Sequence, residues 1–182
     1  MLAALAVSLF AGCGHTATVA GPWVRLSDAQ SGTSFLLPTA VDPVGRTSTG
    51  TDGRTQHARM YQSISDGSSV AVSVIQAKGG FSGYDGRPIY RTMAAKLSGA
   101  GAKDLRLTGV SSSRFHHMAC FDATITFTAA DGEKTYWRLR TLMGRKAMLQ
   151  VQAQVFARQT DEQVRARVDR AFLHAAGSLT TS

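Results

Sequence analysis

The sequence predicts an α+β domain in which helices pack on an antiparallel sheet of about seven strands, in the order βββ-α-ββββ-α. Three observations predict this class. Residues 118–155 hold three consecutive segments of alternating apolar and polar side chains, shorter alternating segments precede residue 110, and two stretches carry apolar residues at helical spacing. With 182 residues, 43% of them hydrophobic, the chain has the size of one globular domain, which we place at residues 23–182.

Basic residues outnumber acidic ones and are spread along the chain. The net charge is +8, from 20 Lys and Arg against 12 Asp and Glu, without a block of five or six like charges. There is no helix-turn-helix, zinc-finger or RNA-recognition pattern, so we expect no nucleic-acid partner. Cys13 ends an N-terminal apolar run and Cys120 lies in a predicted strand, so we expect no disulfide between them.

The N-terminus has the features of an export signal. Met1 to Phe10 is an apolar run too short to span a membrane, and small residues follow it. The segment Phe10-Ala11-Gly12-Cys13 resembles the lipobox of bacterial lipoproteins, whose cysteine receives lipid such as palmitate and becomes the first mature residue. This resemblance implies a signal peptide over residues 1–12 and a lipidated tether over residues 13–22.

An ordinary secretory signal is the alternative for the same residues. Cleavage after Thr18-Val19-Ala20 would discard Cys13 and release the domain. Both interpretations export the protein. With the lipid at Cys13, we expect it at the outer face of the cell membrane, held there by its anchor.

The first half of the domain predicts three strands separated by turns. Phe35 to Pro38 is the first strand, and residues 39–53 are predicted as a long loop because they are rich in Gly, Thr, Pro and Asp. Residues 56–64 and 70–75 alternate and are joined by Asp66-Gly67-Ser68, which predicts a hairpin.

A glycine-rich loop at residues 79–86 separates these strands from a helix. Its spacing matches neither the dinucleotide fingerprint nor the P-loop, so we predict a flap that displays Phe81 and Tyr84 to a partner. Pro88 suits the first helical turn, and apolar residues follow at helical spacing until Ser98-Gly99. Residues 105–110 then form the next strand.

The meander at residues 118–155 has its first turn at Ala130-Asp131-Gly132. Keeping odd residues opposite odd residues requires a three-residue loop with Gly132 in the left-handed conformation. This register pairs three sets of side chains across the strands: Ile125 with Trp137, Thr124 with Arg138, and Asp122 with Arg140. The second turn, at Gly144-Arg145, is expected to keep the same parity, which places Gln150 and Gln152 beside the arginines.

The C-terminal segment predicts the closing helix. Thr160 and Gln163 form a capping box, and an apolar stripe that includes Val168 and Phe172 continues to Gly177. We expect this helix on the odd-residue face of the meander, with Phe172 near Trp137 or Phe127.

The order of these elements resembles the PsbP-like superfamily, and especially small actinobacterial envelope lipoproteins of the LpqN type. The residues that carry the resemblance are Ser34-Phe35-Leu36-Leu37-Pro38, Phe121 to Thr128, Asp131-Gly132, Tyr136 to Leu142, and Val168 to Leu179. The resemblance implies a sheet with packed helices that serves as an interaction module. It implies no catalytic set and no cofactor.

The leading hypothesis is therefore a membrane-tethered binding module of the cell envelope. Its binding surface would be the polar face of the meander, because a guanidinium offers a planar fork of donors to carboxylate, phosphate or sugar groups. A solvated face on which Asp122 and Arg140 merely pair is the competing interpretation. A protein partner held by Phe81 and Tyr84 is a further possibility. The residues of the polar face are Asp122, Thr124, Arg138, Arg140, Gln150 and Gln152.

A hydrolase or transferase is the alternative function. His116, His117, Cys120 and Asp122 include the residue types of a nucleophile, a base and an orienting acid. Adjacent histidines on a strand point to opposite faces, so only one could join Cys120, and the pair does not favour a metal site. We predict Cys120 to be a packing residue.

Overall fold

The computed structural model describes residues 23–49, 54–65, 68–81, 83–155 and 162–181. Over these ranges the chain forms ten strands and two helices, and the predicted α+β class is confirmed. The predicted export signal, Cys13 and residues 160–161 of the capping box lie outside them. The elements are β1 (Val24–Asp28), β2 (Thr33–Leu37), β3 (Val44–Thr49), β4 (Thr55–Ser65), β5 (Ser68–Ala77), α1 (Arg87–Gly99), β6 (Lys103–Phe115), β7 (Met118–Thr128), β8 (Lys134–Met143), β9 (Met148–Val155), α2 (Glu162–Gly177) and β10 (Thr180–Thr181).

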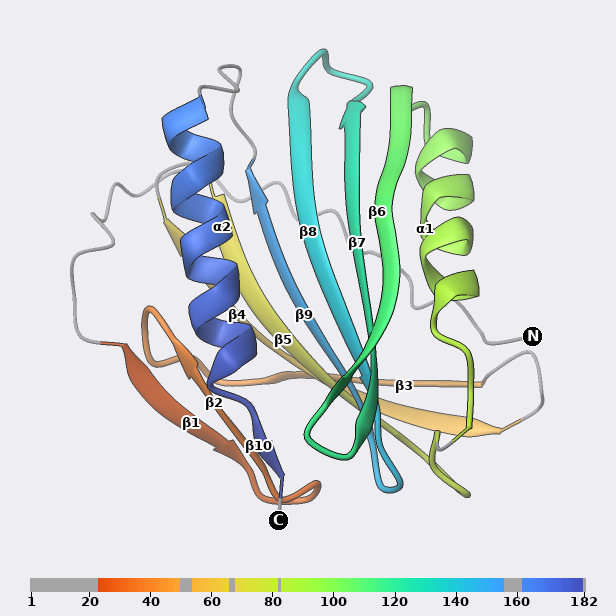
Figure 1. Cartoon of the computed structure of the whole chain (residues 1–182), viewed down its shortest axis with the longest axis vertical. Helices are drawn as coiled ribbons and strands as arrows, with labels where there is room; N and C mark the ends of the chain where they lie inside the picture. Colours follow the sequence, from red (N-terminus) through yellow and green to blue (C-terminus); the bar gives the residue numbers. More distant parts are fainter. Residues whose placement is uncertain (1–22, 50–53, 66–67, 82, 156–161, 182) are drawn as a thin grey trace.

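The strands form two antiparallel sheets (Figure 1). The larger has seven strands in the order β3-β4-β5-β9-β8-β7-β6, and the smaller has three in the order β1-β2-β10. Helix α1 carries the chain from β5 to the far edge strand β6. The chain then returns strand by strand until β9 pairs with β5. In the described ranges, no helix is both long and apolar enough to cross a membrane.

The two helices cover opposite faces of the large sheet. Helix α2 packs over β9 and β5 beside the small sheet, and its Phe172 is fully buried there. Helix α1 packs on the other face, where Tyr90 donates a hydrogen bond to the carbonyl of Phe121 at 2.6 Å. Each face therefore has its own apolar core, and the sheet separates them.

The predicted register between β7 and β8 is confirmed. Ile125 pairs with Trp137, Thr124 with Arg138, and Asp122 with Arg140. Gly132 has φ +88° and donates its amide to the carbonyl of Ala129, closing the three-residue turn. The alternation of side chains and the left-handed glycine were enough to set this hairpin.

The predicted parity of the second turn is wrong. Met143 pairs with Met148, so four residues connect β8 to β9 and odd residues of β8 face even residues of β9. Gln150 and Gln152 therefore lie opposite Thr141 and Leu139, on the face that α1 covers. They do not share a face with Arg138 and Arg140.

The predicted position of the closing helix is wrong for the same reason. The aliphatic side chains of β9 point to the even-residue face of β8, and α2 packs on them. Helix α1 already covers Trp137 and Phe127 on the odd-residue face. Phe172 consequently packs against Arg138 and Arg140. It lies on the opposite face of the sheet from Trp137 and Phe127, its predicted neighbours.

Three strands were not predicted. Strand β1 pairs with β2 along its whole length, in a segment for which no strand was predicted. Strand β3 lies within residues 39–53, which were predicted as a loop, and it pairs with β4 from Val44 to Thr49. Strand β10 adds the last described residues to β2.

Candidate functional site

The arginines of the predicted polar face have acidic partners within the fold. Arg140 donates two hydrogen bonds to Asp122, at 2.8 Å and 3.2 Å, across the pair of strands. Arg138 lies 3.4 Å from the carboxylate of Asp169 on α2. Burial lowers and the hydrogen bond to Asp122 raises the pKa of Arg140, and the net effect is a rise. The cross-strand pair is thus the interpretation that these contacts favour.

The same arginines hold α2 against the sheet. Their guanidinium groups lie over the ring of Phe172, at 5.2 Å for Arg138 and 5.7 Å for Arg140. Both distances suit cation–π attraction. Thr124 lies opposite Arg138 and is half-buried. The face predicted as a binding surface is therefore occupied by contacts with α2.

Gln150 and Gln152 belong to a different environment. The Gln150 amide lies 3.8 Å from the sulfur of Met93 on α1 and 3.4 Å from the hydroxyl of Thr141. Gln150 is buried and Gln152 half-buried on this face. The six residues predicted as one surface are thus divided between the two sides of the sheet.

The glycine-rich loop does not display both of its aromatic residues. Phe81 is fully buried in the α1 core, and the edge of the Tyr84 ring packs on it with centroids 6.2 Å apart. The Tyr84 hydroxyl accepts a hydrogen bond from Arg54 at 2.8 Å. The prediction of an exposed pair is therefore wrong for Phe81. The loop folds back onto the sheet, and the Phe81 amide donates a hydrogen bond to the carbonyl of Gly144.

The residues of the catalytic alternative are not arranged as an activated nucleophile. Cys120 is 1% exposed, and burial is the largest cause that raises the pKa of its thiol. A nucleophilic thiol needs the opposite shift. His116 and His117 are exposed in the turn between β6 and β7, and the ring of His116 packs on Phe115. In the part of the chain that the structure describes, no three metal-binding side chains cluster.

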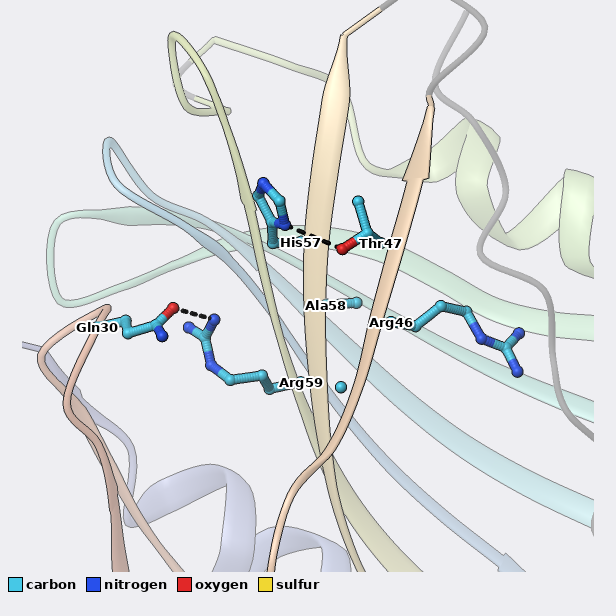
Figure 2. Close-up of a pocket in the computed structure, with 7 residues that line it drawn as sticks. Gln30, Arg46, Thr47, His57, Ala58 and Arg59 are labelled. Carbon is cyan, nitrogen blue, oxygen red and sulfur yellow. Dashed lines mark hydrogen bonds between the residues drawn. The ribbon is translucent and has the colours of Figure 1, made fainter.

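A polar recess lies where the β1–β2 turn meets β3 and β4 (Figure 2). Its volume is about 250 Å³. Gln30, Thr47, His57 and Arg59 turn their side chains toward it, and Thr47 bonds the His57 ring at 3.2 Å. The side chain of Arg46 points away, because Arg46 and Ala58 form a pair on the opposite side of the sheet. The recess lining is Gln30, Gly45, Arg46, Thr47, His57, Ala58 and Arg59.

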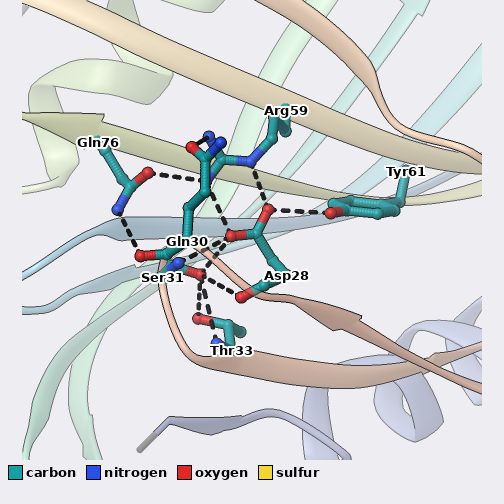
Figure 3. A network of polar contacts seen from close by, with 7 residues as sticks. All are labelled: Asp28, Gln30, Ser31, Thr33, Arg59, Tyr61 and Gln76. Carbon is teal, nitrogen blue, oxygen red and sulfur yellow. Dashed lines mark hydrogen bonds and ion pairs between the residues drawn. The ribbon is translucent and has the colours of Figure 1, made fainter.

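A buried ionic network supports one wall of this recess (Figure 3). The Asp28 carboxylate, 2% exposed, accepts hydrogen bonds from Arg59 at 2.8 Å and from Tyr61 at 2.9 Å. Ser31 donates its amide and its hydroxyl to the same carboxylate. Arg59 in turn donates to Gln30 and Gln76. The guanidinium is thus held in one orientation before any ligand arrives.

The network changes the pKa values of its members. Burial would raise the pKa of Asp28, but hydrogen bonds from Arg59, Ser31 and Tyr61 outweigh it and hold that pKa well below its usual range. Burial, followed by the hydrogen bond to Asp28, raises the pKa of Tyr61 to about 12. The carboxylate and the phenol therefore keep one charge state across the neutral range.

This recess was not predicted from the sequence. Asp28 and Arg59 are 31 positions apart, on β1 and β4, which belong to different sheets. One signal was present: the alternation in residues 56–64 puts His57, Arg59 and Tyr61 on one side of a strand. The alternation does not show which segment of the chain packs against that side.

Comparison with known proteins identifies the fold. No family model matches the sequence, and no curated protein matches it. The solution structure of cyanobacterial PsbP (CyanoP) from Synechocystis is similar, with a TM-score of 0.56 and 15% identity over 94% of this chain and 98% of that one. The chain thus has a PsbP-like fold. A Pseudomonas aeruginosa protein of unknown function, PA94, has a TM-score of 0.39 and 13% identity over 82% of this chain and 94% of that one.

Proposed function

We propose that this protein is an exported binding module of the cell envelope, lipid-anchored through Cys13 and without catalytic activity of its own. The recess at β3 and β4 takes a small polar or anionic group, such as a carboxylate or phosphate, of an envelope protein or ligand. The finer relationship, to actinobacterial lipoproteins of the LpqN type, belongs to the same proposal. The residues at the N-terminus that match the lipobox support the anchor.

The observation that supports the proposed site is the guanidinium of Arg59, which its hydrogen bonds hold in one orientation beside the polar recess. Hydrogen bonds to Asp28, Gln30 and Gln76 fix Arg59 and engage four of its five N–H groups, so a ligand meets one remaining N–H that is already oriented. His57 and Thr47 add a ring nitrogen and a hydroxyl from the same side of β3 and β4 as Arg59. Thr47 and His57 do place a hydroxyl beside an imidazole, but among the described residues no carboxylate hydrogen-bonds to His57 to orient it as a base, so we assign both groups to binding.

A titration tests the recess. The full chain carrying Cys13→Ser, labelled with nitrogen-15, is titrated with sodium acetate and with inorganic phosphate. We expect saturable amide shifts at Gly45, Thr47 and His57, because these residues line the recess. Thr47→Val should weaken them, whereas Thr49→Val, two residues along the same strand, should not. Shifts that do not saturate, or that survive Thr47→Val unchanged, contradict the site.

Metabolic labelling tests the anchor. Cells that produce the full chain are fed an alkyne-tagged palmitate, and the protein is recovered from membrane and soluble fractions. We expect label and membrane association that are both lost in Cys13→Ser, with Cys120→Ser as the matched control that retains them. Label retained in Cys13→Ser contradicts lipidation at this residue.

A further inference from the structure

We infer that the outer edge of β3 binds an extended acidic segment of a partner protein as an added antiparallel strand. This inference rests on the proposed function, since it names the class of partner for the same recess. Strand addition supplies affinity through main-chain hydrogen bonds, and side chains that alternate along the segment supply specificity.

Strand β3 has the features of an available edge. It ends the large sheet, and in the described ranges no strand pairs with its outer side. All six of its residues are exposed. Its register with β4 is regular from Val44 to Thr49, without a shift. Regular unpaired backbone of this kind is a template for another strand.

The opposite edge of the same sheet is protected. Strand β6 pairs with β7 through two register shifts, and Asp104 and Gly109 adopt positive φ within it. Helix α1 packs along it as well. Bulges and a covering helix are common ways to block edge pairing. Among the described residues, one edge of the sheet is therefore blocked and the other is unpaired.

Charge selects the occupant of the open edge. Arg46 is exposed in the middle of β3, and none of the ion pairs between described residues includes it. Lys78, exposed after β5, adds a positive charge across β4 from the Thr49 end of β3, whereas Asp42 lies before the Val44 end. A second copy of the chain would bring another Arg46 to the same short edge, which repulsion disfavours. A segment with carboxylate side chains has the complementary charge.

The recess gives the added strand a place for a side chain. Gly45 and Thr47 face the recess side of β3, since they pair with Arg59 and His57. A Cβ placed at Gly45 would meet nothing within 4 Å. A side chain on the partner segment can therefore pass over Gly45 toward Arg59, while its neighbours in sequence face Arg46.

Synthetic peptides test the edge. The full chain carrying Cys13→Ser is titrated with an acetylated and amidated octapeptide that alternates threonine with glutamate, and with its lysine counterpart. We expect shifts of the amides of residues 44–49 with the glutamate peptide, and about fivefold weaker binding of the lysine peptide at low salt. Equal binding of the two peptides would overturn the charge assignment.

N-methylation of the peptide separates strand pairing from simple charge attraction. Two glutamate peptides are methylated on alternate residues, one set at odd and one at even positions. Only one set removes the N–H groups that face β3, so we expect one peptide to lose about tenfold in affinity and the other to keep most of it. Equal effects of the two sets would overturn strand addition.

Protein variants complete the test. Arg46→Glu should reverse the preference between the glutamate and lysine peptides, while Arg106→Glu, on the protected edge, should leave it unchanged. Unchanged preference in Arg46→Glu would overturn the inference. If acetate binds in the recess but neither peptide binds, this inference alone fails. If the peptides bind as expected and acetate does not, the recess is wrongly assigned.

Discussion

Asp28 joins two sheets through one carboxylate. It lies at the end of β1, and its partners Arg59 and Tyr61 lie on β4 of the large sheet. Because the side chain is almost fully buried, its charge is tolerated only as long as these donors remain. The position of the β1–β2 turn, and with it one wall of the recess, depends on this residue.

Replacing Asp28 should therefore destabilise the fold. Asp28→Asn leaves the Arg59 guanidinium without its counter-charge, and we expect a loss of about 3 kcal/mol in the free energy of unfolding. Urea denaturation measures it. Asp85→Asn is the matched control, because the Asp85 pair with Arg87 is exposed and we expect no measurable change there. Equal effects of the two variants would contradict this account.

The same residue predicts how stability depends on pH. The folded-state pKa of Asp28 lies below its usual value of 3.8, so the native state loses this proton more readily than the unfolded chain. The resulting stability is present above the unfolded value and is lost as the pH falls toward the folded one. We expect urea midpoints to fall between about pH 5 and pH 2, and to fall less steeply in Asp28→Asn.

Gly80 and Gly83 lie in the same loop, and both need a positive φ, but only Gly80 also lacks space for a side chain. Both have positive φ, +64° at Gly80 and +81° at Gly83. A Cβ at Gly80 would lie 1.8 Å from the Arg145 carbonyl oxygen, whereas one at Gly83 would meet nothing within 4 Å. We expect Gly83→Ala to cost about 1 kcal/mol of unfolding free energy and Gly80→Ala clearly more. Equal costs in urea denaturation would contradict the close approach.

The alternation of side chains could predict how strands that follow each other in the sequence pair. The β7–β8 register followed from alternating side chains and a single glycine, because both strands and their turn are contiguous in the sequence. The Asp28 network could not be predicted in this way. Its partners come from elements that meet only when the small sheet packs on the large one, and sequence spacing does not encode that contact.

At the scale of elements, α2 depends on one aromatic ring. Phe172 is fully buried between the arginines of β8 and the apolar side of β9. We expect Phe172→Ala to lower the free energy of unfolding by about 3–4 kcal/mol through lost burial and the cavity it leaves.

The neighbouring residue provides the control for this prediction. Leu173 is 56% exposed on the same helix, so Leu173→Ala should change stability little. Thermal or urea unfolding of the two variants measures the difference. Similar losses of unfolding free energy in both variants would contradict a special role for the buried ring of Phe172.

The missed strands have a common physical cause. Strand β3 is exposed on both sides and contains Gly45, so it lacks the apolar alternation that predicts a half-buried strand. Strand β1 is five residues long, and its two apolar residues, Val24 and Leu26, are too few to establish an alternating pattern. Such strands form because a neighbour offers hydrogen bonds, and their own sequence carries a weak signal.

At the scale of the whole molecule, one sheet joins two cores. The chain has two tryptophans, Trp23 and Trp137. Trp23 packs against the α2 core with its ring 4.3 Å from that of His174, while Trp137 is 2% exposed in the α1 core. Each indole thus reports on a different side of the sheet.

These two probes test whether the domain unfolds as one unit. Because the same strands contribute side chains to both cores, we expect Trp23→Phe and Trp137→Phe to show single transitions in which fluorescence and circular dichroism coincide. In each variant the remaining tryptophan should report the same midpoint as the loss of secondary structure. A fluorescence transition that separates from the loss of secondary structure would mean that the two layers unfold independently.

The four-residue link at 144–147 limits how the chain can vary in length. Adding or deleting one residue there would rotate β9 by half a turn, sending Gln150 and Gln152 into the packing of α2 and the aliphatic residues to the other side. Changes of two residues would preserve the arrangement. Natural variation in this connection should therefore occur in even steps. The same should hold for the Ala130–Gly132 turn, whose three-residue length sets the register of β7 and β8.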